Sequence, residues 1–232
     1  MVGELVPVGR QGEVPVPEPG IGPPSAGAGG PMPFAATTRY EGVGRAAVIA
    51  HKERGRLALA PPLGAALAVA VTAVLAVVDE MTQNPLHPGV VSGESPTGGE
   101  VVVVPAPARR SASRRRGHDP MLRTARQAVR VLRRVGVPAA VVPALFYRRA
   151  VADQHDLGRA ARFANVRGAI GVRNRCVPRL VGRSVVLVDD VVTTGATASE
   201  GWHALRRVGV TPIGIAAITA VRGFFADRSA WR

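Results

Sequence analysis

The run VVLVDDVVTTGAT, residues Val185–Thr197, carries the strongest structural signal in this chain. Its first four residues are apolar and predict a strand that is buried on both faces of a parallel sheet. Two acids follow at once, and a small, hydroxyl-rich turn then opens a helix. In an open α/β sheet, ligands bind beyond the carboxyl ends of the strands. We therefore expect Asp189 and Asp190 to face a ligand.

Each part of the run has a chemical use. Asp189 and Asp190 could hydrogen-bond the two hydroxyls of a ribose ring. The turn offers backbone N–H groups, hydroxyls and the positive end of a helix dipole, which suit a monoester phosphate. Its residues are Thr193, Thr194, Gly195, Ala196 and Thr197. Either half alone is common as a simple cap or turn, so it is their union that indicates a ligand site.

Apolar runs and amphipathic stretches alternate along the second half of the chain. Val101 to Val104 is an uninterrupted β-branched run that predicts another buried strand. Asp119 is placed to cap a helix that begins at Pro120 and runs to Arg134. Further strands are expected at 139–145 and 212–220, with an amphipathic helix at 197–208. This alternation predicts an α/β fold with a mostly parallel sheet.

The remaining segments divide the chain into one domain and its flanks. Residues 1–33 mix Gly and Pro with small and acidic residues, which predicts a disordered leader. The domain is expected over 34–222, and helical spacing first appears between Tyr40 and Gly55. Inside the domain, residues 79–99 are expected to form a long loop and 148–168 a mobile hood. Residues 223–232 are expected to be a tail.

The net charge of +14 comes almost wholly from arginine, because Lys52 is the only lysine. This balance points toward anionic partners, since arginine matches phosphate bidentately, but biased codon usage explains it equally well. Only 4% of the residues are aromatic, which argues against a platform of stacked bases. The single cysteine, Cys176, excludes an internal disulfide and a multi-cysteine zinc site, so a cytoplasmic setting is expected.

One uncharged stretch, Leu57 to Val78, has to be weighed as a membrane span. Pro61, Pro62 and Gly64 interrupt its start, which leaves roughly 16 residues where about 20 are needed. A buried core helix is predicted instead, with no membrane span. No signal peptide is expected, because no basic segment precedes an apolar run at the N-terminus. The histidines lack metal-ligand spacing, and without a Gly-Lys-Ser/Thr sequence there is no P-loop for ATP.

The run Val185–Thr197 resembles the signature of type I phosphoribosyltransferases. Three other segments are similar to the ComF branch of that family, which is associated with bacterial competence for DNA uptake. They are Val104–Pro107 followed by Arg109, Arg110, Arg116 and Gly117; Gln154, Leu157, Arg162, Asn165, Arg167 and Gly168; and Tyr40 through Lys52 to Gly55. Together these segments cover about residues 35–222. The resemblance implies the type I phosphoribosyltransferase fold, a mostly parallel sheet flanked by helices with a small hood.

The resemblance also implies ligands. It implies binding of phosphoribosyl pyrophosphate with Mg²⁺, and an indirect contact of Asp189 and Asp190 with the metal through water or ribose. Arg109 and Arg110 are then expected to neutralise the pyrophosphate through bidentate contacts, the alternative being a solvated basic loop. Two departures stand out. The chain lacks the cysteine-rich zinc module of many ComF proteins, and His118-Asp119 stands where the family usually has Phe-Asn.

Two classes of function follow from this interpretation. The first is an enzyme that transfers a phosphoribosyl group, with Mg²⁺, between phosphoribosyl pyrophosphate and a nitrogenous base, mainly through positioning and electrostatics. No general base is identified. The second is a non-catalytic ComF-like protein that assists uptake of single-stranded DNA with competence proteins. A homodimer is compatible with both classes.

Overall fold

The computed structural model describes residues 20–24, 31–83, 99–108, 117–151 and 159–221. Within these ranges the centre of the fold is a six-stranded sheet with the order β1-β2-β8-β7-β3-β4. Only β1 runs antiparallel to its neighbour among these paired strands; the other neighbours are parallel. The strands are β1 Gly20–Pro24, β2 Pro31–Arg39, β3 Val101–Pro105, β4 Ala139–Val141, β7 Ser184–Val192 and β8 Gly214–Ala220. The predicted α/β fold with a mostly parallel sheet is confirmed.

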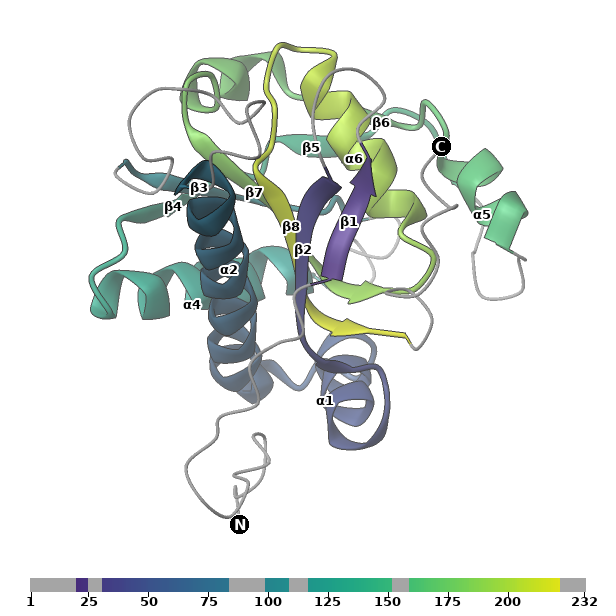
Figure 1. Ribbon diagram of the computed structural model, residues 1–232. Coiled ribbons are helices and arrows are strands. Elements are labelled where there is room, and N and C mark those ends of the chain that lie inside the picture. Colours follow the sequence, from purple (N-terminus) through teal and green to yellow (C-terminus); the bar gives the residue numbers. More distant parts are fainter. Residues whose placement is uncertain (1–19, 25–30, 84–98, 109–116, 152–158, 222–232) are drawn as a thin grey trace.

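Helices cover both faces of this sheet (Figure 1). On one face lie α1 Gly42–Lys52, α2 Ala60–Gln83 and α4 Pro120–Arg134, whose buried apolar side chains form a cluster with Val186 and Val188 of β7. On the other face lies α6 Ala196–Arg206, which packs Trp202 and Leu205 into a second cluster with Leu187. Successive β7 residues thus serve opposite layers, as a strand buried on both faces requires.

A second, two-stranded sheet stands apart from the main one. Its antiparallel strands are β5 Leu145–Tyr147 and β6 Ile170–Val172, and α5 Arg159–Val166 precedes β6. Short 3-10 helices occupy Leu57–Leu59 and Asn174–Arg179. Of the expected hood, residues 148–168, α5 and the described residues beside it lie between β5 and β6 in the chain, and residues 152–158 lie outside the described ranges.

Local sequence signals explain how α4 begins and how it packs. The Asp119 carboxylate accepts a hydrogen bond of 3.0 Å from the Leu122 N–H, and Pro120 occupies the first helical position. The predicted cap is confirmed. Where α2 crosses α4, a Cβ on Gly64 would stand 2.3 Å from the Cβ of Gln127. The absence of a side chain at Gly64 lets the two helices approach closely.

The segment Leu57–Gln83 is the one helix in the described ranges that is long and apolar enough to cross a membrane, judged by length and composition. Half of its most apolar window is buried inside the fold. Leu67, Val71 and Val74 are completely buried, because α2 packs against α4 and the sheet. This packing agrees with the core helix predicted from the sequence.

The structure corrects three expected boundaries. Gly20–Pro24 and Pro31–Pro33, expected in a disordered leader, lie in strands β1 and β2. Proline and glycine obscured these strands, but β2 pairs with β8 from Phe34 onward, and tertiary pairing outweighs weak local propensity. Residues 79–83, expected in a loop, complete α2. The other residues of the leader, residues 84–98 of the loop and the tail 223–232 lie outside the described ranges.

The strand expected at 139–145 is two strands. β4 ends at Val141 and belongs to the main sheet, whereas β5 begins at Leu145 and pairs with β6. Pro143 lies between them and has no N–H to donate to a ladder, which explains why one continuous strand does not form. The chain therefore leaves the main sheet at this point and enters the two-stranded sheet.

Candidate functional site

Strand β7 extends past the end of its neighbour β3. Its pairing with β3 ends at Pro105↔Val188, but its pairing with β8 continues to Val192↔Ala220. The expected strand Val185–Val188 is therefore longer, and Asp189 and Asp190 lie inside it. Along this extension β7 pairs with β8 alone among the described strands. The side chains and backbone there border space that β3 would otherwise fill.

The order of connections makes this place a topological switch point. From β3 the chain passes through α4 to β4, toward one edge of the sheet, and from β7 it passes through α6 to β8, toward the other. The carboxyl ends of β3 and β7 thus lie where the direction of winding reverses. Crevices at such points are the usual ligand sites of open α/β sheets.

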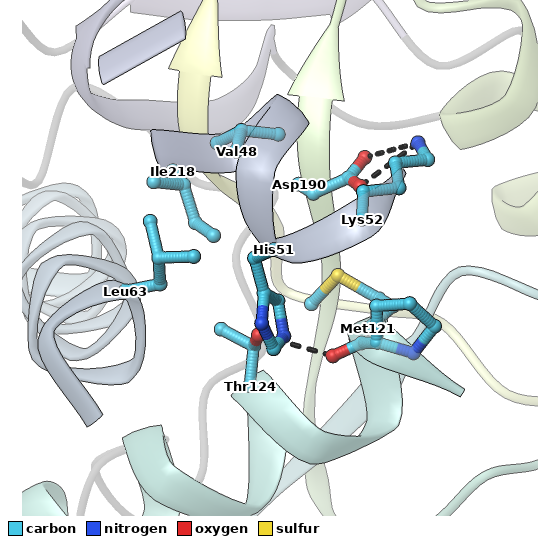
Figure 2. A pocket seen from close by; sticks show the side chains of 9 residues that line it. Val48, His51, Lys52, Leu63, Met121, Thr124, Asp190 and Ile218 are labelled. Atoms are coloured by element: carbon cyan, nitrogen blue, oxygen red, sulfur yellow. Dashed lines mark hydrogen bonds and ion pairs between the residues drawn. The ribbon is translucent and has the colours of Figure 1, made fainter. Parts of the chain in front are cut away.

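The two acids at this point have different surroundings. Asp190 is buried, at 9% exposure, and its carboxylate is bound by Lys52 at the end of α1. The Lys52 Nζ lies 3.0 Å from Oδ1 and 2.8 Å from Oδ2 of Asp190. Asp189 keeps some exposed surface, and its Oδ1 accepts a hydrogen bond of 2.8 Å from the Asp190 N–H. Figure 2 shows Lys52 and Asp190 pointing toward each other.

The charges near the two acids also affect their ionisation differently. Burial of the carboxyl and the nearby charge of Asp190 raise the pKa of Asp189 well above the ordinary carboxyl range, against a smaller lowering by Lys52. The charge of Asp190 in turn raises the pKa of Lys52, which keeps that ammonium protonated. The site therefore combines a Lys52–Asp190 ion pair with a neighbouring carboxyl, that of Asp189, whose pKa is raised.

The turn after β7 has the geometry of a phosphate-binding helix start. Gly195 has φ 77°, in the left-handed region that glycine adopts most easily, and it stands at the N-cap of α6. No side chain caps this end of α6. The Ala196 N–H makes only a 3.4 Å contact with Thr194 Oγ1. Thr193, Thr194 and Thr197 are half-buried around it. The turn residues expected to bind phosphate thus lie directly after the acids.

Two expected site residues cannot be placed. Arg109 and Arg110, expected to bind pyrophosphate, lie outside the described residues, which resume at Gly117. The described chain approaches them through Pro105, the last residue of β3. Because β3 neighbours β7, this end of β3 lies beside the start of the acid-bearing extension.

The sequence interpretation missed Lys52 as a site residue. Lys52 was noted as the only lysine and as part of a family-like segment, but no local pattern connects it with Asp190, 138 positions away. His51, beside it, is 3% exposed and helps to line a cavity of about 10 Å³ with Met121, Thr124 and Asp190 (Figure 2). That volume is close to the minimum for one water molecule.

The side chains present do not form a direct metal cage. Among the described residues no three His, Cys, Asp or Glu side chains gather as metal ligands. A hard cation such as Mg²⁺ prefers several oxygen ligands and commonly takes part of them from substrate phosphates and water. An indirect contact of Asp189 and Asp190 with Mg²⁺, through water or ribose, stays a prediction.

Comparisons with known proteins agree with this geometry. Residues 123–224 match the model of the phosphoribosyl transferase domain family, and this range contains β7, the acids and the turn. This part of the chain is thus similar to the family that the sequence resemblance indicated. Over 83 residues the chain is 35% identical to the transcriptional regulator GfcR of Methanococcoides burtonii. That match covers 36% of this chain and 39% of the relative, and neither comparison distinguishes the ComF branch.

Proposed function

We propose that this chain binds phosphoribosyl pyrophosphate together with Mg²⁺ at the carboxyl end of β7, which lies in the range similar to phosphoribosyl transferase domains. One observation carries the proposal. The acid pair and the Gly195 turn follow each other beyond the last pairing of β7 with β3, at the switch point of the sheet. A ligand that has vicinal hydroxyls and a phosphate matches this order of groups.

Each part of the ligand has a proposed partner. The 5′-phosphate binds at the turn from Thr193 to Thr197, where the start of α6 offers uncapped N–H groups. The ribose hydroxyls bind at Asp189 and Asp190. The pyrophosphate binds at Arg109 and Arg110, an assignment that rests on family resemblance. Mg²⁺, bound by the phosphate oxygens of the ligand, would offset their negative charge.

The proposed reaction is transfer of the phosphoribosyl group to a nitrogenous base. The bond between the anomeric carbon and the pyrophosphate oxygen breaks, a bond from that carbon to a base nitrogen forms, and the nitrogen loses a proton. The protein contributes by holding both reactants in line and by stabilising the charge that develops on ribose and pyrophosphate. No described residue is assigned as general base, and the acceptor base is not assigned.

A second candidate is a non-catalytic protein that binds the same ligand as a signal. The observation in its favour is the match to a protein named as a transcriptional regulator. A ComF-like role in uptake of single-stranded DNA, with competence proteins as partners, is a form of this candidate, and the charge of +14 favours an anionic partner. The proposed setting is the cytoplasm, in keeping with one buried, unpaired cysteine, Cys176.

Calorimetry with phosphoribosyl pyrophosphate and Mg²⁺ tests the shared premise of both candidates. We expect saturable binding by the intact chain, and weaker binding of ribose 5-phosphate, which lacks the pyrophosphate. No binding of either compound by folded protein contradicts the proposal. Release of pyrophosphate in the presence of a panel of purine and pyrimidine bases then separates the candidates, because only the enzyme couples release to a base.

A further inference from the structure

Lys52 connects two parts of the chain that lie far apart in sequence. It ends α1, before the range that the family model matches, whereas Asp190 lies inside that range. Its ammonium contacts both carboxylate oxygens of Asp190, at 3.0 and 2.8 Å. A carboxylate has about four lone-pair positions, so this contact fixes the plane of the Asp190 carboxylate and still leaves positions for further hydrogen bonds.

The end of α1 is anchored in a way that presents Lys52 to the site. His51 is 3% exposed, and its Nδ1 lies 3.1 Å from the Arg56 carbonyl oxygen. That oxygen can only accept, so Nδ1 donates. The Lys52 side chain is 40% exposed while that of Asp190 is 12% exposed. The ammonium therefore reaches the buried acid from the solvent side, where a ligand would also enter.

The ion pair also controls the neighbouring acid. The Asp190 N–H donates to Asp189 Oδ1 at 2.8 Å, and Thr219 Oγ1 donates to the Asp190 carbonyl oxygen at 3.2 Å. The Lys52 ammonium contacts the Asp190 carboxylate, and its positive charge also acts on the neighbouring Asp189. Without Lys52, two neighbouring acids would lack this compensating charge, and a pair of close carboxylates attracts a divalent cation.

We propose that Lys52 is a positioning residue of the ligand site, which holds the Asp190 carboxylate in one orientation and supplies the charge that keeps the acid pair from binding a divalent cation by itself. The pair then recognises ribose hydroxyls, and the metal enters with the phosphates of the ligand. The role of the ribose rests on the proposed function. The exclusion of a divalent cation in the absence of ligand does not rest on the proposed function.

The single lysine makes a direct test possible in the intact protein. Selective ¹⁵N labelling of lysine places one side-chain ammonium signal in the NMR spectrum, because Lys52 is the only lysine. We expect D190N to shift this signal strongly, Mg²⁺ alone to leave it unchanged, and ribose 5-phosphate to shift it. If Mg²⁺ alone shifts the signal as D190N does, the cation displaces Lys52 and the proposal is overturned.

Removal of the charge supplies the second test, which needs no phosphoribosyl ligand. Binding of Mn²⁺, measured by electron paramagnetic resonance, is compared in the parent, K52M, K52R and the double variant K52M/D190N. We expect K52M to bind one additional Mn²⁺ at least about tenfold more tightly than any site of the parent, about 1.4 kcal/mol. K52R keeps the charge and the double variant lacks the acid, so both should resemble the parent.

These outcomes separate the inference from the proposed function. A K52M protein that folds and gains no Mn²⁺ site overturns the role of Lys52, whatever the protein does with phosphoribosyl pyrophosphate. If K52M does not fold, the NMR response of the parent to Mg²⁺ still decides. If the Mn²⁺ and Mg²⁺ results are as expected but ribose 5-phosphate leaves the Lys52 signal unchanged, the proposed ligand is wrong and the charge arrangement stands.

Discussion

The two halves of β7 differ in their neighbouring strands and in the polarity of their side chains. Val185 to Val188 has a parallel neighbour on each side and is completely buried. Asp189 to Val192 pairs with β8 alone among the described strands and carries the two acids. The first half of β7 thus stabilises the sheet, and the second half carries the acids of the candidate site. The change occurs where β3 ends.

The contrast indicates that the site arises because β7 continues past the end of β3. Where β3 continues beside β7, only apolar side chains fill the space between the helix layers. Where β3 ends, polar groups on β7 become tolerable because they face a crevice or an ion-pair partner, such as Lys52, instead of a strand and its core. If the two halves are independent, a change in one should leave the property of the other intact.

The largest effect is expected from Leu187→Ala in the first half. Leu187 is 1% exposed and packs against Gly201 of α6, so the change leaves a cavity that the sheet cannot close. We expect the free energy of unfolding to fall by about 2–5 kcal/mol in urea denaturation. The half-buried Val191→Ala is the matched control in the second half and should cost much less. Equal losses would show that the halves do not differ in packing.

The double variant D189N/D190N tests the second half. It keeps the size of the side chains and removes the charges. Affinity for phosphoribosyl pyrophosphate with Mg²⁺, measured by calorimetry, should fall at least about tenfold, or 1.4 kcal/mol. The melting temperature should be kept or raised, since functional sites often sacrifice stability. Unchanged affinity in a folded variant would exclude these acids as ligand groups, and failure to fold would make them structural.

Gly195→Ala tests the turn between the halves and α6. Gly195 has φ 77°, so an added side chain should cost about 1 kcal/mol of folding free energy and distort the phosphate site. Gly209, with φ 76°, stands at the other end of α6 and serves as a control of equal strain. We expect G195A and G209A to lower the melting temperature alike, while only G195A weakens ligand binding. Equal binding by both would place the phosphate elsewhere.

The raised pKa of Asp189 predicts a pH dependence of stability. The folded protein keeps the proton of Asp189 up to about pH 8, whereas the unfolded chain releases it near 3.8. The contribution of this group to the free energy of unfolding is therefore complete below pH 3.8 and is lost as the pH rises toward 8. Melting temperatures of the parent, compared with D189N, should fall across this window and level off above it. If the melting temperatures of the parent and D189N change in the same way with pH, the pKa of Asp189 is not raised.

The smallest effect is expected at the start of β7, far from the acids. Arg183 Nη1 lies 3.6 Å from Glu100 Oε2, and their side chains are 51% and 40% exposed. Solvent and salt screen such a pair, so Arg183→Ala should change the free energy of unfolding by less than about 1 kcal/mol. Ligand affinity should not change in the same calorimetric assay. A loss as large as that of L187A would mean that Arg183 has a further partner.

The features that the sequence predicted correctly are local ones. The β7 run, the turn at Gly195 and the cap at Asp119 each lie within a few neighbouring residues, so their meaning follows from composition and spacing. The same holds for α2, whose apolar length indicated a core helix. The residues expected to bind ribose and phosphate, Asp189 to Thr197, are contiguous and therefore lie together, whereas Arg109 and Arg110 lie outside the described residues.

The features that the sequence did not predict depend on tertiary contacts. Lys52, at the end of α1, meets Asp190 of β7 only in the folded chain, and nothing near Lys52 in the sequence indicates Asp190. The strand β2 is hidden by proline and becomes a strand because β8 offers a ladder. The extension of β7 past the acids likewise depends on β8, because Val191 and Val192 pair with Thr219 and Ala220.

The pairing of β2 with β8 has a consequence for how the chain matures during synthesis. β2 leaves the ribosome long before β8, so Phe34 and Ala35 find their partners, Ile215 and Ala216, only after β8 has emerged. Until then the edge of β2 that pairs with β8 is open, and contacts of such large sequence separation form slowly. We expect nascent chains that stop before β8 to aggregate or to recruit chaperones, because this edge of β2 stays unpaired.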